Sequence, residues 1–138
     1  MALPLVTLLI AATLVAVYLV LTIHVIRLRR REHAEVTITG STELQRAIRA
    51  HSNFMEYTPL FLIMLALLEL SDSYLWWISG LGLAFLIGRI SHAYGLLVGE
   101  NSTPPVFKGR VFGMMLTLIP LTASALSAVV LVAWVLVH

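Results

Sequence analysis

Cysteine is absent from the 138-residue sequence, and charged residues make up only 12% of it. Without cysteine the chain has no disulfide, no thiolate nucleophile of its own and no Cys metal ligand, so any thiol chemistry must come from a ligand. The five histidines are scattered along the chain, which has neither an HExxH motif nor a paired-carboxylate spacing. We therefore predict that the protein has no metal site.

Hydrophobic residues make up 59% of the chain, more than in an ordinary soluble domain. A bilayer core of about 30 Å requires roughly 20 apolar residues for each helical span. Four stretches meet this length, at approximately residues 4–26, 43–70, 74–98 and 109–137. They use nearly the whole chain, so we predict an all-α fold in which residues 1–138 form one integral membrane domain, a bundle of four transmembrane helices.

The nine Lys and Arg residues predict the orientation of the chain in the membrane. If the spans alternate in direction, all nine lie in the 27–42 and 99–108 connections or in the adjoining halves of the spans. By the positive-inside rule this side is cytoplasmic and both termini face outward, the topology that we expect of a bacterial inner-membrane protein. The RLRRR cluster at 27–31 is then a signal for topology and for contact with membrane lipids, and we expect no nucleic-acid partner.

Polar residues form a stripe along the second span. Gln45, Arg49, Asn53 and Glu56 fall within roughly an 80° arc of a helix. From Arg49 to Glu56 the stripe runs about 10 Å deeper into the membrane. An ionised side chain near the centre of a span costs at least ~2.5 kcal/mol, so such residues tend to mark a site or a buried pair.

The third and fourth spans bring polar groups to the same depth, the cytoplasmic half of the bilayer. Arg89 and His92 are three residues apart and are therefore neighbours on the surface of the third span. Lys108 and Arg110 open the fourth span. Three helices are thus expected to present polar side chains to one region of the bundle.

Two explanations of these polar groups follow from residue chemistry. In the first, Glu56 pairs with Arg49 or Arg89 in an ion network that only fixes helix register. However, Arg49, Arg89 and Arg110 face a single anion at this depth, and an unbalanced buried cation is expensive. The surplus of cations favours the second explanation, a site for an anionic ligand that arrives from the cytoplasm.

Small residues in the third and fourth spans predict close helix packing. Gly80, Ala84, Gly88 and His92 recur every four residues, a spacing that lets two helices approach closely. The run TASALSA at 122–128 is expected to have the same role. These residues favour a tightly packed bundle and do not by themselves indicate a site.

The stretch RAHSNFMEY at 49–57 contains the pattern Arg-Ala-x-x-Asn-x-x-Glu-Tyr at the start of the second of four spans. Together with Gly88-Arg89-x-x-His92 in the third span and an arginine that opens the fourth, it closely resembles the membrane-associated proteins in eicosanoid and glutathione metabolism, the MAPEG family. The resemblance covers essentially the whole chain. One departure is Leu96, which stands where several eicosanoid-making members have an aromatic or polar residue.

The resemblance implies a homotrimer of four-helix protomers with glutathione bound between subunits near the cytoplasmic face. It assigns glutathione binding to residues of the second and third spans: Arg49, Asn53, Glu56, Tyr57, Arg89 and His92. It assigns to Arg110 the catalytic role of stabilising the glutathione thiolate. Glutathione carries two carboxylates and one ammonium, which suit a cation-rich site that contains one acid.

The function implied is a membrane-bound, glutathione-dependent transferase or peroxidase that acts on lipophilic electrophiles or lipid hydroperoxides from the bilayer. The alternative is a non-catalytic protein that binds lipids or another ligand on the same scaffold. A third interpretation, a proton- or anion-conducting assembly that uses Glu56 and His92, is disfavoured because the outer half of the chain has no polar path across the bilayer.

Overall fold

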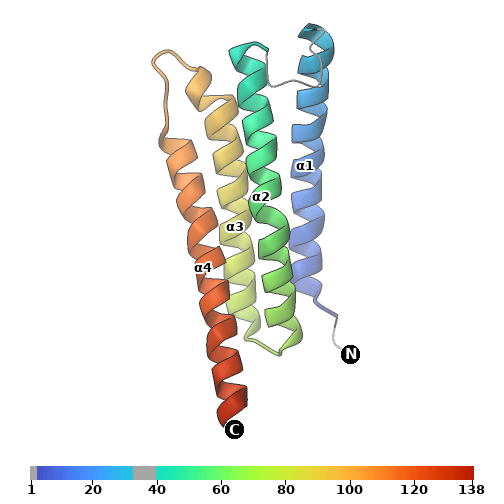
Figure 1. Ribbon diagram of the computed structural model, residues 1–138, viewed down its shortest axis with the longest axis vertical. Coiled ribbons are helices and arrows are strands. Elements are labelled where there is room, and N and C mark those ends of the chain that lie inside the picture. The colour runs from blue at the N-terminus through green and yellow to red at the C-terminus, as the bar shows by residue number, and fades with distance from the viewer. Residues whose placement is uncertain (1–2, 33–39) are drawn as a thin grey trace.

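The computed structural model describes residues 3–32 and 40–138. Four long α-helices and one short 3-10 helix make up this part of the chain, in the order α1 (Leu5–Glu32), α2 (Thr42–Leu70), α3 (Leu75–Leu97), η1 (Gly99–Asn101) and α4 (Lys108–Val137). The four long helices stand side by side as an antiparallel bundle (Figure 1). All four are long and apolar enough to cross a membrane, which confirms the predicted all-α membrane fold.

The first helix is longer than predicted, because α1 continues beyond residue 26 to Glu32. The predicted end followed the edge of the apolar run, but Arg and Leu are good helix formers and no Gly or Pro stops the helix there. Its last turn also contains three cations that interact favourably with the helix dipole: Arg29, Arg30 and Arg31. The other helix ends differ from the predicted ones by at most one residue, and residues 33–39 of the first connection lie outside the described part of the chain.

The helix ends divide the bundle into two chemically different ends. The end of α1, the start of α2 and η1 lie together at one end, which we call the basic end (Figure 1). The α2–α3 turn, the start of α1 and the end of α4 lie at the other (Figure 1). Every described Lys and Arg is in the helix halves nearest the basic end, the distribution that the positive-inside argument requires.

At the basic end, side chains fasten the end of α1 to the start of α2. Ser41 is the N-cap of α2, and its hydroxyl oxygen accepts a hydrogen bond from the Leu44 N–H at 3.1 Å. The Ser41 N–H donates to Glu32 Oε2 at 2.9 Å, and its hydroxyl donates to Glu32 Oε1. Arg31 Nη2 donates to Glu43 Oε2 at 2.6 Å. In a capping box, the acceptor for the N-cap N–H is a Glu or Gln side chain of the same helix. Here that acceptor is Glu32, which belongs to the preceding helix α1.

At the opposite end, the carboxylate of Glu69 in the last turn of α2 caps the start of α1. Glu69 Oε1 accepts from the Val6 N–H at 2.9 Å, while Oε2 accepts from the Thr7 N–H at 2.8 Å and from the Thr7 hydroxyl at 2.7 Å. The first N–H groups of a helix have no partner within it, and an anion there is also favoured by the helix dipole. The α1–α2 pair is therefore fastened at both ends.

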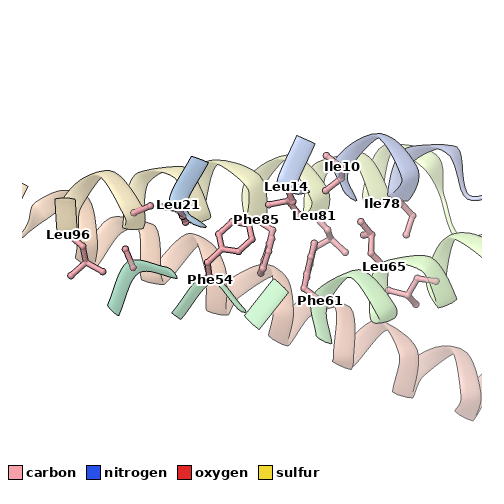
Figure 2. Close-up of a cluster of buried hydrophobic side chains, with 13 residues drawn as sticks. Ile10, Leu14, Leu21, Phe54, Phe61, Leu65, Ile78, Leu81, Phe85 and Leu96 are labelled. Atoms are coloured by element: carbon pink, nitrogen blue, oxygen red, sulfur yellow. The ribbon is translucent and has the colours of Figure 1, made fainter. Parts of the chain in front are cut away.

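The core of the bundle is built around α3, which packs against all three other long helices. The Phe61 and Phe85 rings stack in parallel with centroids 3.9 Å apart. Figure 2 shows these rings among apolar side chains from three helices: Ile10, Leu14, Leu21, Phe54, Leu65, Ile78, Leu81 and Leu96. Lipid tails are as apolar as these side chains, so the association of the helices depends on close packing more than on escape from water.

Glycines bring the backbones of α3 and α4 into direct contact. A Cβ atom on Gly88 would lie 2.7 Å from the carbonyl carbon of Leu116 in α4, and one on Gly113 would collide with the backbone nitrogen of His92. The predicted small-residue face of α3 therefore packs as expected at Gly88. At Gly80, in contrast, an added Cβ would meet nothing within 4 Å.

Replacing Glu69 with Ala should destabilise the bundle by about 1–3 kcal/mol, because the N–H groups of Val6 and Thr7 lose their acceptors. Glu69→Gln keeps one oxygen acceptor and should lose less. The thermal unfolding midpoint in detergent measures both, and Asp72→Asn is the control because Asp72 has a φ of 56° that Asn also tolerates. Equal midpoints for Glu69→Ala and the wild type would contradict this role.

Candidate functional site

A cleft of about 560 Å³ is formed by α2, α3 and α4 in the half of the bundle nearest the basic end. Charged, amide and imidazole side chains line one part of it, and sulfur-containing and aliphatic side chains line the rest. The lining residues are Arg49, Ser52, Asn53, Glu56, His92, Leu96, Arg110, Val111, Met114, Met115 and Leu118.

The wall from α2 is the polar stripe of the second span. Arg49, Asn53 and Glu56 lie on one face because they are separated by about one helical turn each. Gln45, which belongs to the same arc, does not line the cleft, because its side-chain amide donates to the Gly40 carbonyl at 3.0 Å before the helix begins. Ser52, which is not part of the predicted polar stripe, also lines the cleft next to Asn53.

The wall from α4 changes from polar to apolar along the helix. Arg110 lies in the first turn, and Met114, Met115 and Leu118 follow at the spacing of one helix face. The start of α4 is held against α3, where a Cβ atom on Gly95 would collide with the Arg110 backbone nitrogen. This contact brings Arg110 to the same cleft as His92.

Arg89 is fully buried and supports the cleft without lining it. Its exposed fraction is 1%, and its Nη2 donates to Asn53 Oδ1 at 2.8 Å. Its guanidinium carbon lies 5.7 Å from the centre of the Tyr57 ring, a cation–π contact. Within the described structure, Arg89 Nε and Nη1 and the buried His92 Nδ1 have no hydrogen-bond partner.

Arg49 and Glu56 are charged side chains of the α2 wall that form no salt bridge in the described part of the chain. Among the described residues Glu56 forms no ion pair, either with Arg49 or with Arg89, so the pairs required by a register network are not formed in this part of the chain. Both side chains are exposed on the surface of the single chain. They are therefore available to a ligand or to another subunit.

Arg110 has an ion-pair partner, Glu100, so the expectation that Glu56 is the single anion facing Arg49, Arg89 and Arg110 is wrong. Its Nη1 donates to Glu100 Oε1 at 2.8 Å, in a salt bridge between α4 and η1. The signal for this pair was weak, because only the path of the connection brings the two residues to the same level. In the sequence, the pair was indicated only by an acid just after the third predicted span and a cation at the start of the fourth.

The predicted site residues thus fall into two groups. The cleft brings together Arg49, Asn53, Glu56, His92 and Arg110 from three helices. Arg89 does not line the cleft but donates a hydrogen bond to Asn53, which does, and Tyr57 contacts Arg89. At the departure from the family pattern, Leu96 lines the cleft, and the neighbouring Tyr94 is 62% exposed and does not line it.

These features define an integral membrane protein of four spanning helices with a charged cleft toward one end. A model of the MAPEG family matches residues 7–136, and the chain belongs to this family. The family includes glutathione-dependent transferases and peroxidases.

Two similar proteins bear the name inner membrane protein YecN, one from Escherichia coli strain K12 and one from Escherichia coli O6:H1 strain CFT073. Each is 31% identical over 113 residues, which cover 82% of this chain and 82% of the relative. Together with the four spanning helices, they confirm the predicted placement as an integral protein of a bacterial inner membrane.

Replacing Gly113 with Ala should destabilise the protein by about 1–3 kcal/mol, because the added Cβ forces α4 away from the His92 backbone. The matched control is Gly80→Ala, which adds the same methyl group to open space and should stabilise α3 by about 0.5–1 kcal/mol. Thermal unfolding in detergent measures both changes. Similar shifts for the two variants would show that the close contact of α3 and α4 does not limit stability.

Proposed function

We propose that this protein is a glutathione-dependent transferase or peroxidase that acts on lipophilic electrophiles or lipid hydroperoxides from the bilayer. Membership of a family that includes such enzymes supports this proposal. The observation that carries it is the pattern of charge in the cleft, where Arg49, Glu56 and Arg110 line one space and Glu56 pairs with neither arginine.

Glutathione carries groups of both charges, as the cleft does. Its two carboxylates suit guanidinium groups, which bind carboxylates with two parallel hydrogen bonds. Its single ammonium suits Glu56, the acid of the α2 wall. In this proposal Arg49 binds a carboxylate, Asn53 is held in position by Arg89, and Arg110 faces the sulfur.

The chemistry begins with the thiol, which loses its proton to water while the Arg110 guanidinium stabilises the sulfur anion. In conjugation, the sulfur forms a bond to an electrophilic carbon and the leaving group departs with the electron pair of its bond. In peroxide reduction, the sulfur attacks the terminal oxygen, the O–O bond breaks and the lipid alkoxide takes a proton. A second glutathione then converts the sulfenic acid to a disulfide and water.

The proposal includes a homotrimer and a site near the cytoplasmic face, with both termini outside. Arg49 and Glu56 are exposed on the single chain although they lie on a membrane-spanning helix. Contact of such charges with lipid costs at least ~2.5 kcal/mol near the centre of a span, so cover by a second subunit is favoured. Three large apolar side chains continue the exposed face of α2 beyond the charges: Leu60, Ile63 and Leu67.

The direct test is a glutathione titration of the purified protein in detergent, followed by thiolate absorbance and by conjugation of a generic aromatic electrophile. We expect saturable binding and turnover. Binding without turnover would support the alternative, a non-catalytic ligand-binding protein. The absence of binding would refute the proposal.

Replacing Arg110 with Ala should lower turnover by about 10²–10³-fold, because the developing negative charge on sulfur loses its donor. Glutathione affinity should fall by a smaller factor, since Arg49 and Glu56 remain. Lys108→Ala is the matched control, because it removes a cation from the same turn that does not line the cleft. Equal losses of affinity and turnover would show that Arg110 only helps to bind the ligand.

Replacing Glu56 with Gln should weaken glutathione binding by about 10–100-fold, because an ammonium-to-carboxylate hydrogen bond becomes a weaker one. A glutathione analogue without the amino group should bind the wild type and Glu56→Gln equally. The oligomer size in detergent should not change. Loss of the oligomer in this variant would instead support a role of Glu56 in helix register.

A further inference from the structure

This inference rests on the proposed function, under which the Arg110 guanidinium interacts with two anionic groups. The proposal requires Arg110 to stabilise the glutathione sulfur. The structure shows that its Nη1 already donates to Glu100 Oε1 at 2.8 Å. A guanidinium carries five N–H donors, so it can serve both a carboxylate and a sulfur at once.

Glu100 is held where it is by the connection that carries it. The Val106 N–H donates to the Gly99 carbonyl at 2.8 Å, and the Ser102 hydroxyl donates to the same carbonyl at 2.6 Å. The Ser102 hydroxyl also lies 2.9 Å from the Pro104 carbonyl. The side chain of Glu100 is only 13% exposed, whereas that of Arg110 is 48% exposed. The acid is therefore the more buried member of the pair, on a connection held by hydrogen bonds.

Charged and titratable groups from each element that borders the cleft, or that contacts Arg110, are present near this end of α4. Glu100 comes from η1, His92 from α3 and Lys108 from the same turn of α4, while α2 contributes Arg49 and Glu56. Among the described residues, the Glu100 carboxylate is the ion-pair partner of Arg110. It is therefore the group that most directly offsets the positive charge available to a bound sulfur.

We propose that Glu100 is a positioning residue that sets the reactivity of bound glutathione by sharing the Arg110 guanidinium with its sulfur. The carboxylate orients the planar guanidinium and partly neutralises it. The thiol proton still leaves to water, but the sulfur anion is stabilised less than it would be by an unpaired arginine. The less stabilised thiolate is the stronger nucleophile, because nucleophilicity rises with basicity.

The test is a pH titration of the thiolate absorbance of bound glutathione in the wild type and in Glu100→Gln. We expect the midpoint to fall in the variant by about one pH unit, which gives roughly 10-fold more thiolate below the midpoint. Glu100→Asp retains the charge on a shorter side chain, so its midpoint should lie between the two. Glu43→Gln removes the same charge from the basic end, at the Arg31 pair, and should leave the midpoint unchanged.

The outcomes separate this inference from the proposed function. If the wild type binds glutathione and the midpoint of Glu100→Gln is unchanged or higher, the inference is wrong and the proposed function stands. An equal shift in Glu43→Gln would also overturn it, because the effect would then be one of net charge. If no protein binds glutathione, both fail. If Glu100→Gln does not fold, an unchanged midpoint in a folded Glu100→Asp overturns the inference and a lower one supports it.

Discussion

An ionised side chain at membrane depth raises the free energy of the protein unless a hydrogen bond, an opposite charge or a ligand offsets it. This constraint organises the half of the bundle near the basic end. Arg89 is buried against Asn53 and the Tyr57 ring, and Arg110 is paired with Glu100. Arg49 and Glu56 on α2 form no salt bridge among the described residues, and the cleft forms where these two side chains are exposed. The site thus lies where these charged side chains have no oppositely charged partner within hydrogen-bonding distance in the described part of the chain.

The scaffold that presents these charges uses two kinds of helix contact. The α1–α2 pair is fastened at its ends by carboxylates of one helix at the start of the other, Glu69 on α1 and Glu32 on the N-cap of α2. The α3–α4 pair is instead held along its length by backbone contact at glycines such as Gly88 and Gly113. Carboxylate caps leave side chains free to pack between helices, whereas glycine contacts leave no space between them. The cleft is accordingly lined by α2 as well as by α3 and α4.

Much of this arrangement follows from periodicity, which is a local property of the sequence. The lengths of the apolar runs predicted four helices, and the 3.6-residue repeat placed Arg49, Asn53 and Glu56 on one wall. Glu100 was not predictable in this way, because its contact depends on the path of the 99–108 connection. The continuation of α1 to Glu32 was missed because hydropathy marks the edge of the membrane and not the end of the helix. The assignment of glutathione to the cleft remains a prediction from the family resemblance and the charges.

For the proposed reaction, the change from polar to apolar along the α4 wall has a consequence for how a lipophilic substrate reaches the cleft. Met115 and Leu118 are 55% and 43% exposed on a spanning helix, so in the single chain the apolar part of the cleft is open to the side of the bundle. A molecule dissolved in the hydrocarbon phase can reach this part without crossing water. Its working concentration is then set by its partition coefficient and by the volume of lipid present. For the proposed substrates, poor solubility in water becomes an advantage, because it concentrates them in the lipid phase.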